Sequence, residues 1–227
     1  MSLEFEAGFF RRLLEQAGVR PRNVLVVGCG AGVEVAHIAQ VTGASVIGVD
    51  LDVDPRQQGS NARLARADAR RLPFRDGVFD AVYCYHVLEH VPTPETAIAE
   101  ARRVLAPGGI GYFGTPNKSR LVGYAGGRAT FGQKIAWNLA DYGKRLTGRW
   151  SNERGAHAGF TDSELQRLLA RSFRRVESVS LPYYLGKYPK LEGLWKMSFK
   201  LGLARFLAPS VYFRTASESG EVRRSDR

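Results

Sequence analysis

Three glycines, Gly28, Gly30 and Gly32, have the residue type and spacing that point most directly to ligand binding. They lie between the apolar run 24–27, typical of a buried parallel strand, and residues 33–41, whose apolar residues recur at helical spacing. Glycine lets the backbone turn tightly and approach a ligand, and the following helix N-terminus presents N–H groups. The dinucleotide-binding fingerprint would need glycine at Val33. The spacing therefore disfavours a pyrophosphate ligand.

Two carboxylates follow this loop along the chain. Asp50 ends a second apolar run about 20 residues after the glycines, where a carboxylate can accept hydrogen bonds from both hydroxyls of a ribose. Asp68 follows the next expected strand and can accept from an exocyclic amine, while the N–H group of Ala69 donates to a ring nitrogen. Ligands of doubly wound sheets bind at the carboxyl ends of strands. Together these residues predict a site for a nucleoside at that edge.

The elements that must position these groups alternate along the chain. Apolar segments of strand length lie at residues 24–27, 45–49, 62–67, 79–83, 110–114, 174–181 and 211–215. Helical patterns lie at residues 9–17, 33–41, 95–105, 161–171 and 191–207. The alternation predicts a single α/β domain over residues 1–227, with an N-terminal helix within residues 1–20. Its fold is expected to be Rossmann-like and doubly wound, with a mostly parallel seven-stranded sheet.

Residues 118–156 interrupt this alternation. They are rich in glycine, basic and aromatic residues, and we expect them to form a basic lid insertion over the ligand edge. Residues 1–117 contain 12 Arg, no Lys and 13 acidic residues, whereas residues 118–227 contain 21 Lys and Arg and 9 acidic residues. This asymmetry favours an anionic partner, namely a nucleic acid, an acidic membrane surface or an acidic substrate. The alternatives are a solvated arginine-rich surface and a helical cap that only closes the pocket.

Composition limits the class and location of the protein. Its 227 residues, 44% of them hydrophobic, suit one globular domain, and no apolar run is long enough to span a bilayer. The N-terminus has no export signal, and two cysteines, Cys29 and Cys84, fit a reducing compartment. We therefore expect a cytoplasmic protein that can lie peripheral to a membrane. Residues 218–227 are expected to form a flexible tail.

An ordered set of motifs resembles the class I methyltransferases. It comprises residues 24–32, 48–50, 67–69, 72–74, 79–80, 86–91 and 105–109. The resemblance implies S-adenosylmethionine as cofactor, bound by Gly28, Cys29, Gly30, Gly32, Asp50, Leu51, Asp68, Ala69 and Tyr85. One position departs from the family pattern, because Val26 stands where these enzymes usually have an acid near the methionine ammonium.

The acceptor side is expected to follow Tyr85, at the end of the strand at 79–83. His86 is the preferred catalytic base, because imidazole titrates near neutral pH, and the alternative is a pocket-wall residue. Residues 85–91 and 114–117, with His157, resemble the quinone-biosynthesis O-methyltransferases. That resemblance implies an apolar phenol, methylated at a membrane surface.

The resemblance also implies a possible metal site, because eukaryotic members of that group hold magnesium with two glutamates and a histidine at positions matching residues 85–91. Glu89 and His90 match two of these positions, but His86 occupies the first. His86, Glu89 and His90 could still face one metal at helical spacing. The preferred expectation is that no metal is bound.

Three functional hypotheses follow. The leading one is an S-adenosylmethionine-dependent O-methyltransferase with a small apolar or lipid-like acceptor. The basic C-terminal half keeps an RNA methyltransferase as a second hypothesis. Val26 keeps a non-catalytic S-adenosylmethionine binder as the third.

Overall fold

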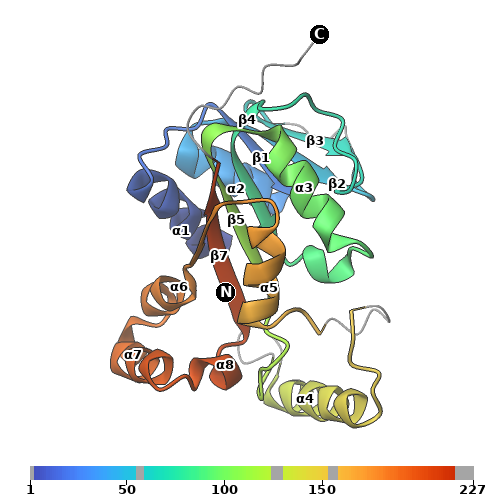
Figure 1. The fold of residues 1–227 in the computed structure, drawn as a ribbon, viewed down its shortest axis with the longest axis vertical. Coiled ribbons are helices and arrows are strands. Elements are labelled where there is room, and N and C mark those ends of the chain that lie inside the picture. The colour runs from blue at the N-terminus through green and yellow to red at the C-terminus, as the bar shows by residue number, and fades with distance from the viewer. Residues whose placement is uncertain (1–2, 55–58, 124–129, 153–157, 218–227) are drawn as a thin grey trace.

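A seven-stranded sheet organises the computed structural model, which describes residues 3–54, 59–123, 130–152 and 158–217 (Figure 1). The strand order is β3-β2-β1-β4-β5-β7-β6. Neighbouring strands among β1 to β5 are parallel, and β7 is antiparallel to both β5 and β6. The strands are β1 (Asn23–Val27), β2 (Ser45–Asp50), β3 (Ala62–Arg66), β4 (Phe79–Tyr85), β5 (Leu105–Pro116), β6 (Arg175–Ser178) and β7 (Ser210–Ala216). The expected sheet and fold class are confirmed.

The central strands are buried on both faces, which explains their continuous apolar sequences. In β1, Val24 and Val26 pack into one hydrophobic cluster, while Leu25 and Val27 pack into the other. The parallel register pairs Val27 with Val49 of β2 and with Cys84 of β4. The carboxyl ends of these three strands therefore lie side by side.

Helices cover both faces of the sheet (Figure 1). One face packs against α1 (Leu3–Gln16), α2 (Val33–Thr42) and α6 (Ser180–Lys187). The other packs against α3 (Pro94–Val104) and α5 (Asp162–Ala170). A capping box of Thr161 and Glu164 begins α5.

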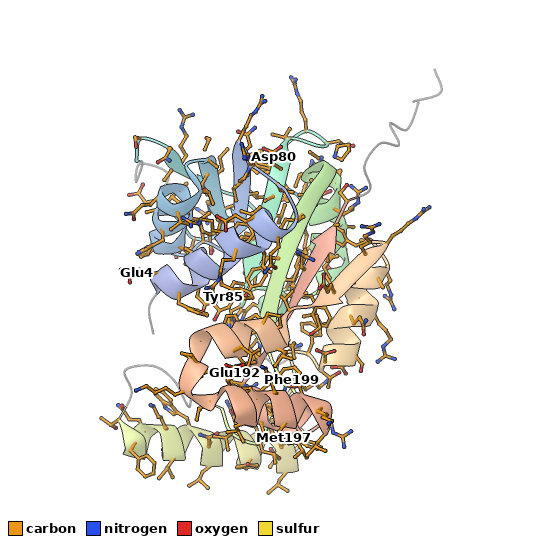
Figure 2. All side chains as sticks on the ribbon, turned by 90° about the vertical axis from the view of Figure 1, so that its left-hand side faces the viewer. Glu4, Asp80, Tyr85, Glu192, Met197 and Phe199 are labelled. Carbon is orange, nitrogen blue, oxygen red and sulfur yellow. The ribbon has the colours of Figure 1, made fainter. Side chains whose placement is uncertain are left out.

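A third group of helices lies beyond the carboxyl edge of the sheet, at the lower end of Figures 1 and 2. It comprises α4 (Phe131–Leu146), α7 (Glu192–Lys200) and α8 (Ala204–Leu207). The preceding segment anchors α4: the guanidinium of Arg120 pairs with the Asp141 carboxylate at 3.2 Å, both side chains being buried. The Asn138 side chain also exchanges two hydrogen bonds with the backbone of Gly123.

Four predicted elements differ in extent from the structure. The helix expected at 9–17 begins at Leu3 as α1, and the strand expected at 110–114 spans Leu105–Pro116 as β5. The strand expected at 174–181 ends at Ser178, and α6 begins at Ser180, because the helical turn buries Tyr183 and Tyr184 against the sheet. The helix expected at 191–207 is divided into a 3-10 turn (Pro189–Leu191), α7 and α8. Gly202, with φ of +69°, lies at the break between α7 and α8.

The lid segment contains α4, a helix that the sequence analysis did not identify. Its signal was an apolar series at helical spacing, namely Phe131, Ile135, Leu139, Tyr142 and Leu146. The expected flexible tail at 218–227 and His157 lie outside the described residues.

Gly114 of β5 offers a test of packing at the carboxyl edge. The rings of Tyr85 and Tyr212 flank it, nearly parallel, with centroids 6.2 Å apart. A β-carbon on Gly114 would lie 2.8 Å from Tyr212 and 3.0 Å from Tyr85.

We expect Gly114→Ala to lower the free energy of unfolding by about 1–3 kcal/mol through overpacking. Gly193→Ala, at an exposed and open position of α7, is the control and should leave stability unchanged or slightly higher. Denaturant unfolding measures both, and equal effects would contradict the packing argument.

Candidate active site at the carboxyl edge of the sheet

A cavity of about 270 Å³ lies where the central parallel strands end. Its lining includes six of the predicted site residues, contributed by the segments after four strands: Gly28, Asp50, Leu51, Asp68, Ala69 and His86. These six residues therefore lie together at the carboxyl edge, and their roles in binding stay a prediction. Cys29, Gly30, Gly32 and Tyr85 do not line this cavity.

Backbone hydrogen bonds hold the glycine loop against β2. The N–H groups of Gly28 and Cys29 both donate to the carbonyl oxygen of Val49, at 2.8 and 3.1 Å. Gly28 adopts φ of +71°, and a β-carbon there would lie only 2.1 Å from the side chain of Val87. Glycine is therefore required at position 28 for both conformation and space.

Gly32 and Cys29 contribute to the packing around the glycine loop. Gly32 precedes α2, and a β-carbon on it would lie 2.7 Å from Leu64 of β3. The Cys29 side chain is buried close to Gly48, where an added β-carbon would lie 2.9 Å from the sulfur. Burial, with a smaller effect of Asp50, raises the pKa of the Cys29 thiol to about 11. This thiol is therefore protonated at neutral pH and is not a nucleophile.

Asp50 is held in place by the glycine loop itself. Its Oδ2 atom accepts a hydrogen bond from the Gly30 N–H group at 2.8 Å, and Oδ1 accepts from the Asp52 N–H group at 3.3 Å. Since each carboxylate oxygen has two acceptor sites, capacity remains for ligand hydroxyls. Asp50 also lines the cavity, so its position fits the ribose of a nucleoside.

Asp68 has a partner that the sequence analysis missed. The Arg70 side chain binds the Asp68 carboxylate, with contacts of 3.1 Å from Nε and 2.7 Å from a terminal nitrogen. Hydrogen bonds from Arg70 lower the pKa of Asp68, which keeps this carboxylate charged. Arg70 lines the same cavity, so an amine that binds Asp68 must share the carboxylate with the guanidinium.

His86 has a constrained backbone and a buried acidic partner. It has φ of +55°, the only positive φ of a non-glycine residue in the described ranges, and its N–H group donates to the carbonyl of Gly114 at 2.8 Å. Its Nδ1 atom lies 3.2 Å from Oε1 of Glu89, whose side chain is 1% exposed. With a carboxylate as acceptor, Nδ1 carries the proton and the Nε2 lone pair is the ring's acceptor. The sequence could have predicted this pair, because His86 and Glu89 are only three residues apart.

The remaining predicted residues around His86 have other surroundings. Tyr85 is half-buried and packs edge-on against the His86 ring, with centroids 4.3 Å apart, so its contact with a cofactor stays a prediction. His90 lines the cavity, and its Nε2 atom lies 3.9 Å from Oε1 of Glu89. Within the described ranges, no group of three or more His, Cys, Asp or Glu side chains is arranged to hold a metal ion.

A second cavity, of about 680 Å³, lies near the end of β5. Asn117, Thr161 and Val211 contribute to its lining, together with apolar residues of α7 and α8 and of the turn between them. No described residue of 118–152 lines the smaller cavity, so a covering role for the basic segment stays a prediction. In the described part of the chain, no helix is long and apolar enough to cross a membrane.

Known proteins share this arrangement of motifs. Residues 25–113 match the family described as "Methyltransferase domain". The ubiquinone biosynthesis O-methyltransferase of Pseudomonas aeruginosa (strain LESB58) is 32% identical over 157 residues, covering 62% of this chain and 67% of that protein. The chain belongs to the class I S-adenosylmethionine-dependent methyltransferases. The expected cofactor class is thereby confirmed.

Other relatives of this methyltransferase match over shorter regions. The sterol 24-C-methyltransferase ERG6B of Gibberella zeae is 36% identical over 109 residues, covering 43% of this chain and 29% of that protein. The norajmaline N-methyltransferase of Rauvolfia serpentina is 33% identical over 113 residues, covering 45% of this chain and 39% of that protein. The matched regions thus span less than half of these two relatives. The names of the three relatives refer to O-, C- and N-methylation, so family membership does not define the acceptor.

Solved structures share the fold of this methyltransferase. A putative methyltransferase from Bacillus halodurans has a TM-score of 0.54 at 15% identity, covering 92% of this chain and 98% of that one. A geranyl diphosphate methyltransferase in complex with S-adenosylmethionine has a TM-score of 0.52 at 19% identity, covering 95% and 86%. At these identities the likeness concerns the fold, which agrees with the observed sheet.

The geometry of the glycine loop and Asp50 predicts a selective cofactor site. S-adenosylmethionine and its demethylated product should bind, whereas NAD should not, because the loop spacing disfavours a pyrophosphate. Asp50→Ala should weaken binding of the demethylated product by about 1.5–3 kcal/mol, the range for hydrogen bonds to a charged group. Glu15→Ala, which removes an exposed acid of α1, is the control. Isothermal titration calorimetry measures these affinities, and comparable binding of NAD would refute the assignment.

Proposed function

We propose that this methyltransferase transfers a methyl group to a hydroxyl oxygen of a small apolar or lipid-like acceptor. The observation that carries the proposal is the His86–Glu89 pair beside the cavity at the carboxyl edge. Gly28, Asp50, Asp68 and Ala69 are the residues that would hold the nucleoside part of the cofactor. When bound, S-adenosylmethionine supplies a methyl group on a positively charged sulfur.

In this proposal His86 is the general base. Its Nδ1–H donates to Glu89, so Nε2 accepts the proton that the acceptor hydroxyl loses. The resulting imidazolium is stabilised by the buried Glu89 carboxylate, which also fixes the orientation of the ring. Glu89 acts through His86 and is therefore a positioning residue. The positive φ of His86 and its backbone bond to Gly114 hold the base at the end of β4.

Two observations support an apolar acceptor. The larger cavity, near the end of β5, has Phe199, Leu201 and Leu203 in a lining that also contains Asp162, Arg205 and several serines, so one part of it suits an apolar group. Relatives named for ubiquinone biosynthesis and for sterol methylation are similar to this chain. Both names refer to apolar acceptors.

We predict that His86→Ala lowers the turnover number by a factor of roughly 10²–10⁴, the usual contribution of a general base. Glu89→Gln should also lower the turnover number, because the neutral amide stabilises the imidazolium poorly. Its effect should be smaller than that of His86→Ala, because the base itself is retained. Cofactor affinity, measured by calorimetry, should remain close to that of the wild type in both variants.

His37→Ala, a half-buried histidine of α2 that does not line the cavity, is the matched control. Near-normal turnover of His86→Ala would assign His86 to the pocket wall. Strong chelation should leave wild-type activity unchanged, and a loss of activity would revive a metal site at His86, Glu89 and His90.

We also propose that the helices beyond the carboxyl edge contact an anionic membrane surface. Large apolar side chains are exposed on them: Phe131, Ile135, Leu139 and Leu146 on α4, and Leu194 and Met197 on α7. Both views place α4 and α7 at the same end of the molecule, and Figure 2 labels Met197 on α7 there. Exposed Lys144 and Arg149 lie on or beside α4. Apolar residues next to cations suit the interfacial region of a bilayer.

We predict that the protein co-sediments with liposomes in proportion to their acidic lipid content, and less at higher salt. Each Lys or Arg near such a surface contributes about 1 kcal/mol, so Lys134, Lys144 and Arg149→Gln together should abolish sedimentation. Arg145 is kept, because it donates to the Arg120 carbonyl and stacks on Trp150 at 3.8 Å, which makes it structural.

The control replaces exposed Arg20, Arg63 and Arg75 with Gln near the amino edge of the sheet, removing equal charge. Equal losses of sedimentation in both triple variants would show that only net charge matters. A wild type that ignores acidic liposomes but binds RNA, with affinity falling steeply as salt rises, would favour the RNA methyltransferase hypothesis.

A further inference from the structure

The carboxylate that would face the cofactor's amino group is missing from β1. Val26 stands in the strand two positions before Gly28, and its side chain is fully buried in the apolar cluster beneath α1 and α2. S-adenosylmethionine ends in an α-amino acid, whose ammonium group needs acceptors or a negative charge once it is desolvated. Val26 can provide neither.

Glu34 of α2 approaches the same face of the sheet from the helix side. It lies two residues after Gly32, in the first turn of α2, and is half-buried. Its Oε1 atom lies 3.5 Å from the hydroxyl oxygen of Tyr83, and Tyr83 is the β4 residue directly paired with Val26. Burial raises the pKa of Tyr83 well above its usual value, so its hydroxyl stays a donor to the carboxylate. Tyr83 thus holds an acid beside the glycine loop.

A second carboxylate gives this corner excess negative charge. Glu6 of α1 is buried, and its Oε1 atom accepts hydrogen bonds from Lys187, at 2.9 Å, and from Tyr183. Its other oxygen, also buried, has no hydrogen-bond partner among the described residues. Burial and the neighbouring Glu6 raise the pKa of Glu34, whereas His86 acts in the opposite direction. Glu6 and Glu34 are therefore neighbouring acids, of which Glu6 pairs with Lys187 and Glu34 with the Tyr83 hydroxyl.

We propose that Glu34, oriented by Tyr83, receives the α-ammonium group of the bound cofactor and takes the role that an acid at position 26 would have. The cationic group would partly neutralise the Glu6–Glu34 pair. The proposal concerns cofactor binding, so it does not depend on the acceptor or on the role of His86.

Two ligands that differ only in the amino-acid part separate this role from general support of the loop. S-adenosylhomocysteine contains the α-ammonium group, whereas 5′-methylthioadenosine retains the nucleoside and sulfur but lacks the amino-acid group. Glu34→Gln keeps the shape of the side chain and removes its charge. Calorimetry should show S-adenosylhomocysteine binding weakened about 10- to 100-fold, the range for a charge-assisted hydrogen bond. Binding of 5′-methylthioadenosine should change by less than about twofold.

Two further variants sharpen the test. Tyr83→Phe removes only the hydroxyl that orients Glu34, so it should weaken S-adenosylhomocysteine binding by less than Glu34→Gln and spare 5′-methylthioadenosine. Glu4→Gln removes an exposed acid from α1 and should change neither affinity. Wild-type affinity of Glu34→Gln for S-adenosylhomocysteine would overturn the proposal. Equal weakening of both ligands would also overturn it, because Glu34 would then support the loop and not the ammonium group.

Discussion

The carbonyl oxygen of Val49 accepts backbone hydrogen bonds from both Gly28 and Cys29, and the geometry of the whole edge depends on this junction. It joins the glycine loop to the end of β2, so the next N–H group in the loop, that of Gly30, reaches the carboxylate of Asp50. The parallel register with β4 then brings His86 to the same edge. A ligand therefore meets groups whose positions are set by backbone contacts, which side-chain substitutions elsewhere disturb little.

The acidic side chains at this edge differ in burial, and the degree of burial suits each of them to a different role. Asp50 and Asp68 lie at the open cavity and are bound by donors of the chain, which suits them to receive neutral hydroxyl and amine groups. Glu89 is enclosed and contacts His86, so its charge acts on the imidazole. Glu34 lies between these extremes, half-buried and close to a second acid. Differences in burial thus suit the same functional group to the three proposed roles of orienting a nucleoside, supporting a base and attracting a cation.

Residues at the ends of consecutive parallel strands could be predicted from sequence, because strand order and the carboxyl-edge rule place them together. The structure brings four of the residues so placed, Gly28, Asp50, Asp68 and His86, to one cavity. It could not predict that Arg70 binds Asp68, since this depends on a side-chain conformation at the surface. Nor could it distinguish α6 from a strand extension, because the choice depends on how Tyr183 and Tyr184 pack against the sheet. The Glu6–Lys187 contact joins residues 181 positions apart and leaves no local sequence signal.

That same contact has a consequence for synthesis on the ribosome. Glu6 precedes the first strand of the sheet, whereas Lys187 is translated only after all the parallel strands. Until then the Glu6 carboxylate lacks its lysine, and burying it would carry a large desolvation cost. The packing of α1 with a charged, buried Glu6 therefore depends on Lys187 of α6. The N-terminal helix and the C-terminal third of the chain are in this way coupled through one buried ion pair.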